Sequence, residues 1–281
     1  MNQRILATGV RRGQTELRQL LRTPREYLSQ LSNPVIFVAT ASMQSSRVAD
    51  GAVELSSIIV AGGVASMLVL TALIWLPQQL ANEREDGTLL RLRGVPHGPA
   101  VYVIAKTVMV VAISLGCALL ALFGGALVTG SGLPGSLTQW LTLLWVLLLG
   151  LVAMTLLGAA IGAILPNPRE ALAALMLPVV GLLFISGVFF PASVMPRWLQ
   201  IVGEVFPLKW IAQGVRSAML PDSAVVAETS GSWQHLETAG VLGVWIVLGL
   251  LLAPRLLRRS ARRQSGSRLA ARREAASQRA Y

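Results

Sequence analysis

Long apolar stretches separated by short polar segments dominate the hydropathy pattern of the chain. A membrane-spanning helix needs about 20 consecutive apolar residues to cross a hydrocarbon layer of about 30 Å. Five stretches meet or approach that length, at 55–77, 100–129, 139–165, 171–190 and 236–254. A membrane β-barrel would instead show alternating segments of about 10 residues. The pattern therefore predicts an all-α integral membrane protein.

The first candidate span, 27–43, is shorter and more polar than the others. Only Pro34 to Met43 is clearly apolar, so the segment taken alone could be re-entrant. Both ends of the chain are strongly basic, and Lys and Arg mark the cytoplasmic side of membrane proteins. If 27–43 did not cross, the two termini would lie on opposite sides. We therefore expect six transmembrane helices with the N- and C-termini in the cytoplasm.

Polar segments at both ends frame the transmembrane domain, which we place at 26–254. Residues 1–25 mix Arg and Gln with spaced apolar side chains, which is typical of an amphipathic helix lying on a membrane surface. This helix is expected to end near Pro24, because the residue before a proline avoids helical angles. Nine of the 24 basic residues fall in the tail 255–281, which we expect to be disordered and drawn to anionic membrane lipid.

The composition agrees with a lipid-exposed protein. Hydrophobic residues make up 54% of the chain and charged residues 13%, with a mean hydropathy of +0.63. Soluble domains carry about 25% charged residues. The net charge of +11 does not indicate binding to nucleic acid, because the basic residues flank the expected spans. Cys117 is the sole cysteine and lies within a span, which excludes a disulfide framework.

The sequence contains no recognisable cofactor or metal site. A phosphate-binding loop needs Gly before a Lys-Ser or Lys-Thr pair, whereas Lys106-Thr107 follows Ala105 inside a span. His97 and His235 are expected on opposite sides of the membrane, so they cannot share a metal. Carboxylate pairs of the kind that drive ion-coupled transport are missing from spans two to six. We therefore expect a chain that is not an enzyme and binds no cofactor.

A charged segment at 83–93 separates the second and third spans. Its acidic residues are expected at the start of a short helix, where they favour the positive end of the helix dipole. Gly94 and Pro96 would then end that helix. A charged helix between two spans favours contact with a soluble partner. The alternative is an ordinary solvated loop helix.

A second unusual segment, 187–219, follows the fifth span. It is too interrupted by proline to be one span and too apolar for a plain outer loop. Trp198 and Trp210 suit the membrane interface. The pattern predicts two short amphipathic helices, at about 194–204 and 208–219, that enter the outer leaflet in a re-entrant manner. The alternative is a simple interfacial anchor.

These two segments together resemble those of ABC-2-type transporter permeases. The similarity to the loop after that family's second span is carried by Glu83-Arg84-Glu85-Asp86-Gly87-Thr88-Leu89 and Pro96. The similarity to its segment after the fifth span is carried by Gly187-Val188-Phe189-Phe190-Pro191, Met195-Pro196, Leu199, Pro207 and Arg216. The order of the motifs and the six-span layout also match. The closest resemblance is to the daunorubicin and multidrug resistance type of exporter permease, from which the short, polar first span departs.

The resemblance implies a permease that pairs with a second copy, as a homodimer or a heterodimer, and with two separate ATPase subunits that hold ATP and Mg. The N-terminal helix would act as a gate. The segment received by the ATPase would comprise Glu83, Arg84, Glu85, Asp86, Gly87, Thr88, Leu89 and Arg91. The outer segment that shapes the exit would include Gly187, Phe190, Pro191, Pro196, Trp198, Pro207 and Arg216.

The leading interpretation is efflux of an amphipathic or hydrophobic substrate, drug or lipid-like, across the inner (plasma) membrane. The lack of charge in the spans favours such a cargo. The excess of Arg over Lys suggests a GC-rich bacterial source. Two alternatives remain: a non-transporting membrane anchor or assembly protein, and an ion-coupled secondary transporter.

Overall fold

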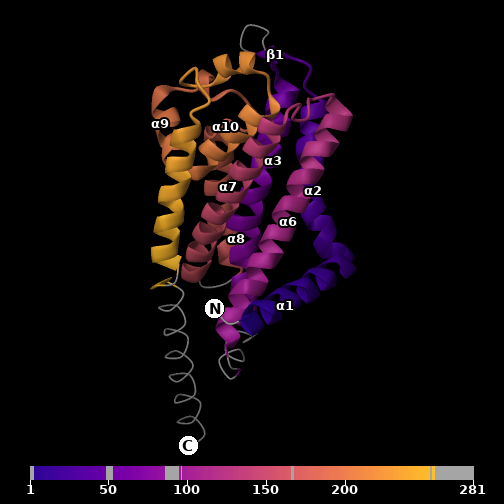
Figure 1. Ribbon diagram of the computed structural model, residues 1–281, viewed down its shortest axis with the longest axis vertical. Helices are drawn as coiled ribbons and strands as arrows, with labels where there is room; N and C mark the ends of the chain where they lie inside the picture. The colour runs from indigo at the N-terminus through magenta and orange to yellow at the C-terminus, as the bar shows by residue number, and fades with distance from the viewer. Residues whose placement is uncertain are drawn as a thin grey trace, which may run out of the picture.

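The computed structural model describes residues 3–48, 53–85, 95, 97–165, 168–253 and 255–256. They form a bundle of long helices lying side by side, with one helix across one end (Figure 1). The helices are α1 (Gln3–Arg22), α2 (Pro24–Ser42), α3 (Leu55–Val69), η1 (Leu70–Trp75), α4 (Leu76–Glu85), α6 (Gly98–Thr129), α7 (Leu137–Ile164), α8 (Pro168–Ile185), α9 (Arg197–Val205), α10 (Pro207–Met219) and a last helix, His235–Ala253. We refer to the two ends of the bundle as the α1 end and the α10 end.

Among the residues that the structure describes, four helices are long and apolar enough to cross a membrane. They are Leu55–Glu83, Ala100–Thr129, Leu137–Ile164 and His235–Ala253. α2 and α8 lie alongside them in the bundle (Figure 1) but do not meet that measure, because α2 is partly polar and the apolar part of α8 is only Leu172–Ile185. The protein is therefore a mostly helical membrane protein with four candidate spans. Crossing by α2 and α8 stays a prediction.

The second span continues beyond Pro77, where the sequence had suggested its end. α3 passes through the π-helix η1 into α4, which is described as far as Glu85. Proline lacks an N–H and its ring crowds the carbonyl four residues earlier. A π-helical stretch directly before it changes the local hydrogen-bond spacing, so the chain stays helical through the proline. Glu83 consequently lies in the last turn of a span, and the expectation that it starts a separate short helix is wrong.

α8 also differs from the bounds expected for the fifth span, 171–190. α8 ends at Ile185 rather than near residue 190, because Gly187 adopts a positive φ of 72° and turns the chain. Such a backbone angle favours glycine. The described bounds of α2, α7 and the last helix lie within a few residues of the expected spans.

α3 lies at the centre of the bundle and is buried along nearly its whole length. It packs against α2, α6 and α10. Two glycines permit direct approach of backbones: Gly62 faces the backbone of Val188, and Gly158 of α7 faces the carbonyl of Ala72. A side chain at either position would overlap the facing backbone. Small residues therefore set the spacing of the bundle.

The α10 end is closed by short elements. The strands β1 (Arg47–Val48) and β2 (Val53–Glu54) pair antiparallel, and the 3-10 helices η3 (Ala192–Val194) and η4 (Asp222–Ala227) flank α9 and α10. Two short helices, α9 and α10, lie close to the expected positions between α8 and the last helix. Their entry into a membrane leaflet stays a prediction. α10 is almost wholly buried against α7 and α3, so it belongs to the bundle rather than lying on its surface.

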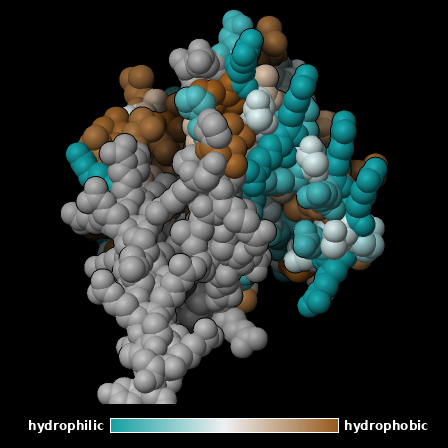
Figure 2. Space-filling view, turned by 90° about the horizontal axis from the view of Figure 1, so that it is seen from below, coloured by the Kyte–Doolittle hydropathy of each residue, from teal (hydrophilic) through white to brown (hydrophobic). Residues whose placement is uncertain are grey.

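The α1 end has a polar surface. The N-terminus and the end of the last helix both lie at this end (Figure 1). Figure 2 looks at it directly and shows hydrophilic side chains gathered over α1. Exposed arginines contribute to that surface, namely Arg4, Arg11, Arg18 and Arg22 of α1 and Arg25 at the start of α2.

Candidate functional site

A group of charged side chains at the α1 end joins three helices that are distant in the sequence. Nζ of Lys106 in α6 lies 2.9 Å from Oε2 of Glu16 in α1, and Lys106 forms a second ion pair with Glu83 in α4. Tyr102, one turn before Lys106, donates a hydrogen bond from its hydroxyl to Glu83. Arg12 donates from Nε to Oε1 of Glu16 at 2.8 Å. We call these five residues the charge cluster.

The charge cluster is largely shielded from solvent. Lys106 is 8% exposed, and the side chains of Glu16 and Glu83 are 20% and 18% exposed. A buried ammonium is tolerated where carboxylates pair with it. The ring of Tyr102, whose centroid lies 5.6 Å from Nζ of Lys106, adds a favourable aromatic surface. The charge cluster therefore fixes α1, α4 and α6 to one another.

Glycines explain how α1 comes close enough to α6 for this contact. Added Cβ atoms at Gly9 and Gly13 would overlap side-chain atoms of Ile104 and Val108 in α6. Residues three and four apart lie on one face of a helix. Glu16 therefore lies on the same face of α1 as the two glycines, where it meets Lys106.

The surroundings of Glu16 favour its charged form. Burial acts to raise the pKa of Glu16, but hydrogen bonds from Lys106 and Arg12, together with their positive charges, act in the opposite direction and prevail. The pKa of Glu16 is therefore held below its ordinary value. Glu16 stays ionised at neutral pH, which keeps the Glu16–Lys106 ion pair formed.

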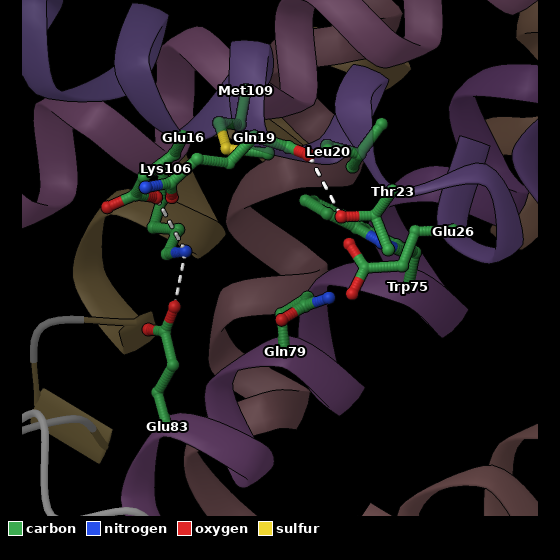
Figure 3. A pocket seen from close by; sticks show the side chains of 10 residues that line it. All are labelled: Glu16, Gln19, Leu20, Thr23, Glu26, Trp75, Gln79, Glu83, Lys106 and Met109. Carbon is green, nitrogen blue, oxygen red and sulfur yellow. Dashed lines mark hydrogen bonds and ion pairs between the residues drawn. The ribbon is translucent and has the colours of Figure 1, made fainter.

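A cavity of about 400 Å³ opens beside the charge cluster. Figure 3 shows Lys106 between Glu16 and Glu83, with Gln79 and Glu26 on the other side of the cavity. The cavity thus lies where α1 meets the end of the second span. A displacement of α4 would act through Lys106 on both α1 and α6.

Part of the predicted ATPase-contacting segment is placed by the structure. Glu83 belongs to the charge cluster, and Arg84 and Glu85 complete α4. The other predicted residues lie outside the described residues, and they are Asp86, Gly87, Thr88, Leu89 and Arg91.

Sequence reasoning did not identify the partners of Lys106. It placed Lys106 inside a span and gave it no partner. The structure instead pairs Lys106 with two acids. One feature of the sequence pointed to Glu16, because it is the sole acidic residue within α1. Its pairing with Lys106 depends on the direction in which α1 lies across the end of the bundle.

A second cleft, of about 550 Å³, lies between α2, α8 and the second span from η1 onwards. Ser29, Gln30 and Asn33 of α2 bring polar groups to its lining, together with apolar residues of α8 such as Leu172 and Met176. The polar residues that make α2 a weak span are therefore lining residues of a cleft. Because its lining combines polar and apolar groups, the cleft suits an amphipathic molecule.

At the α10 end a buried ion pair holds the outer segment together. Arg216 of α10 donates from Nε and Nη2 to the two carboxylate oxygens of Glu228, at 2.6 and 3.0 Å. Its Nη1 donates to the carbonyl of Gly187 at 2.8 Å. Arg216 and Glu228 are 3% and 5% exposed. One guanidinium therefore connects α10, the turn after α8 and the chain beyond η4.

Prolines and aromatic residues of the outer motif shape the chain around α9. Pro196 immediately precedes α9 and Pro207 begins α10, positions where the missing N–H of proline costs little. Trp198 is 64% exposed, as suits a residue at a membrane interface. Pro191 is buried in the turn after α8, and the ring of the preceding Phe190 lies 6.1 Å from that of Phe184 in α8.

One residue of the segment after α8, Phe189, also lines the cleft. Phe189 stacks on Phe37 of α2 with ring centroids 5.4 Å apart and an angle of 10° between the rings. Phe37, Phe184 and Phe189 all line the cleft. The turn after α8 therefore connects the Arg216–Glu228 ion pair to the wall of the cleft through a few neighbouring residues.

The polar side of α10 is also buried, which sequence reasoning did not expect of an amphipathic helix. Gln213 donates from Nε2 to the carbonyl of Ser232 at 3.0 Å, and Nζ of Lys209 lies 3.7 Å from the ring centroid of Trp210. Burial lowers the pKa of Lys209, although nearby carboxylates, Glu204 first among them, act to raise it. The chain after η4 covers this side of α10.

Within the described ranges, no group of three or more His, Cys, Asp or Glu side chains is placed to hold a metal ion. The family model described as ABC-2 type transporter matches residues 13–220, more than half of the chain. The chain belongs to the ABC-2 type transporter family. It is therefore a membrane transport component, of a family that generally works with ATPase subunits.

Two relatives share about a third of their residues with this ABC-2 family member over part of its length. A putative transport permease, ycf38 of Porphyra purpurea, is 32% identical over 83 residues, which are 30% of this chain and 28% of that protein. Nodulation protein J of Rhizobium leguminosarum bv. trifolii is 32% identical over 126 residues, which are 43% of this chain and 45% of that protein. The chain thus matches less than half the length of each relative.

The family match begins within α1 and ends just after α10. It therefore includes the cleft, Arg216 and every residue of the charge cluster except Arg12. The ABC-2 resemblance noted from the sequence is confirmed, whereas its closer likeness to daunorubicin-type exporters stays a prediction.

Proposed function

We propose that this ABC-2 transporter chain is the permease subunit of an ATP-driven exporter. The observation that carries the proposal is the charge cluster, in which Lys106 holds the end of the second span, through Glu83, to α1 through Glu16. A mechanical step that begins outside the membrane needs such a rigid connection to reach the transmembrane helices.

The proposed orientation puts the α1 end in the cytoplasm of a bacterial cell. In this arrangement α2 and α8 complete six crossings of the inner membrane, and both termini are cytoplasmic. Exposed arginines on α1, over which Figure 2 shows a hydrophilic surface, support it, because Arg and Lys accumulate on the cytoplasmic side.

The segment 83–91 is the proposed contact with the ATPase. ATP and Mg would bind to two separate ATPase subunits, and two copies of the permease would face them as a homodimer. Closure of the ATPases would move the end of α4. The Glu83–Lys106–Glu16 connection would carry this movement to α6 and to α1, which acts as a gate.

The proposed path for the substrate is the cleft between α2, α8 and the second span. Its mixed lining supports an amphipathic cargo, drug or lipid-like, rather than a strongly charged one. The turn at Gly187–Pro191 would shape the exit, because Phe184 before it and Phe189 within it line the cleft. One relative is named a putative transport permease, which agrees with a transport role.

The first test is purification of the chain from gently solubilised native membranes, with ATPase activity and co-purifying subunits measured in the eluate. We expect an ATPase subunit in equimolar amount. It should be lost when Glu83, Glu85 and Asp86 are replaced by Ala. The matched control replaces three exposed acids of the α10 end, Glu54, Asp222 and Glu237, by Ala, and it should retain the ATPase.

A different role would give a different result. A membrane anchor that transports nothing would bring down a soluble complex without ATPase activity. An ion-coupled transporter would purify without a partner and would respond to proton uncouplers without needing ATP. Either result, with the control variant intact, would contradict the exporter proposal.

A further inference from the structure

A separate apolar cavity lies in the angle between α1 and α2, on the side that faces α6. Its volume is about 280 Å³. The lining is formed by apolar side chains of all three helices, among them Leu17, Leu21, Leu31, Ile113 and Leu120. The bend between α1 and α2 creates this space, because α1 crosses the end of the bundle while α2 turns along it (Figure 1).

The cavity opens to the surroundings of the protein through an apolar mouth. Leu21 is 59% exposed and Leu120 is 49% exposed. Gly116, which also lines the cavity, has no other atom within 4 Å of the place where a Cβ would lie. Since α6 is a span and α1 is an amphipathic helix at its end, this mouth lies where hydrocarbon chains begin. An apolar opening at that depth suits a lipid chain.

Positive charge lies next to the mouth. Arg18 and Arg22 flank Leu21 on α1, and Arg25 follows at the start of α2; all three are exposed. Among the described residues, no carboxylate lies within ion-pair distance of these three arginines. Glu16 is occupied by Lys106, and Glu26 faces the other cavity, beside the charge cluster. The surroundings therefore complement an anionic headgroup above a hydrocarbon chain.

We propose that this cavity binds one acyl chain of an anionic glycerophospholipid from the leaflet at the α1 end. The chain fills the space between α1, α2 and α6, and the phosphate lies beside Arg18 and Arg22. The bound lipid is distinct from the transported substrate, because the cleft proposed for transport extends towards α8 and shares only Gln30 of α2 with this cavity. By filling the space between α1 and α2, the lipid chain would hold α1 in its position across the end of the bundle.

The test uses the full chain in phosphatidylcholine vesicles that contain phosphatidylglycerol with a photoreactive diazirine on one acyl chain. After irradiation, adducts are mapped by mass spectrometry. We expect them on residues 17–31 and 112–120. Gly116→Leu fills the cavity, and because burial of several methylene groups is lost, adducts there should fall by roughly tenfold. Gly240→Leu is the control: its Cβ site is equally open, and it lies at the far end of the last helix.

A second variant tests the headgroup without altering the packing. Arg18→Gln with Arg22→Gln should lower adducts from phosphatidylglycerol by roughly tenfold, because each basic side chain near a membrane surface contributes to binding of anionic lipid. Adducts from the matching phosphatidylcholine probe should change little.

Three outcomes would overturn the proposal. Adducts could be missing from both segments, they could be equal in Gly116→Leu and Gly240→Leu, or they could be insensitive to the arginine substitutions. Oxidative crosslinking offers an independent outcome, because Cys117 is the sole cysteine and lines the cavity. Formation of a disulfide-linked dimer in the vesicles would show that a second copy covers this face, and would also overturn it.

Discussion

Nζ of Lys106 lies 2.9 Å from Oε2 of Glu16, although 90 residues separate them along the chain. The contact holds α1 against α6 by a buried charge as well as by apolar packing. Glu83 pairs with the same ammonium from the end of the second span. One lysine therefore joins α1, α6 and the segment proposed to meet the ATPase.

Replacing Lys106 by Met should strongly destabilise the protein. The substitution leaves the shielded Glu83 without its cation and leaves Glu16 paired with Arg12 alone. Breaking a buried pair in this way costs about 3–5 kcal/mol. We expect a lower unfolding midpoint for the purified chain, measured in one fixed detergent against SDS. Glu54→Gln is the control, because Glu54 and its partner Arg47 are about half exposed and such pairs are worth at most about 1 kcal/mol. Equal shifts for the two variants would contradict the burial argument.

Acid should weaken the attachment of α1. The pKa of Glu16 is lowered in the folded protein, so its ion pair contributes stability that is fully present above the ordinary carboxyl range. That contribution is lost as pH falls through the lowered folded value. The unfolding midpoint of the natural chain should therefore fall on acidification more than that of Glu16→Gln, which has no such group. Parallel midpoints for both chains from pH 7 downwards would show that Glu16 is not the titrating group.

The outer ion pair should matter most for the chain that covers α10. Glu228→Gln leaves the buried guanidinium of Arg216 without its counter-ion, at a cost of about 3–5 kcal/mol. We expect faster hydrogen exchange in residues 221–235, measured by mass spectrometry. Arg197→Gln, which alters an exposed arginine at the start of α9, should leave this exchange unchanged. Slow exchange in both variants would mean that Arg216 does not hold the segment.

How far sequence reasoning reached can be judged from Lys106 and Pro77. Hydropathy alone located the long apolar helices, because crossing a membrane fixes their length. It placed the end of the second span at Pro77, since the π-helix that accommodates this proline has no signature in a hydropathy pattern. It also gave Lys106 no partner, because pairing with Glu16 depends on the angle at which α1 crosses α6.

In the segment 187–219, too, the helices were predicted from the sequence and their long-range contacts were not. The helix expected from about 208 agrees with α10, which begins at Pro207, whereas α9 begins at Arg197, after Pro196, rather than near 194. Proline is readily accommodated at a helix start. The burial of α10 was not expected, because the partner of Arg216 is Glu228 in a following segment that carried no signal of its own. Local rules place helices well, whereas contacts between distant segments require the fold.

Enlarging Gly158 should loosen the packing of α7 on the second span. An added Cβ would overlap the backbone carbonyl of Ala72, which cannot move aside as a side chain can. Overpacking of this kind costs about 1–3 kcal/mol, so Gly158→Ala should lower the unfolding midpoint. Gly181→Ala in α8 is the control, because the space around its Cβ site is open within 4 Å. If both alanine variants unfold together with the natural chain, the close contact at Gly158 is not present in the membrane protein.

The most direct test of the account is the number of substrate molecules exported per ATP hydrolysed, measured in vesicles that contain the permease with its ATPase subunits. In Glu83→Gln we expect ATP hydrolysis to continue while export per ATP falls by at least about fivefold, because the end of α4 is no longer held by charge to Lys106. Glu54→Gln should keep the natural ratio. A natural ratio in Glu83→Gln would contradict the claim that the charge cluster couples the ATPase to the transmembrane helices.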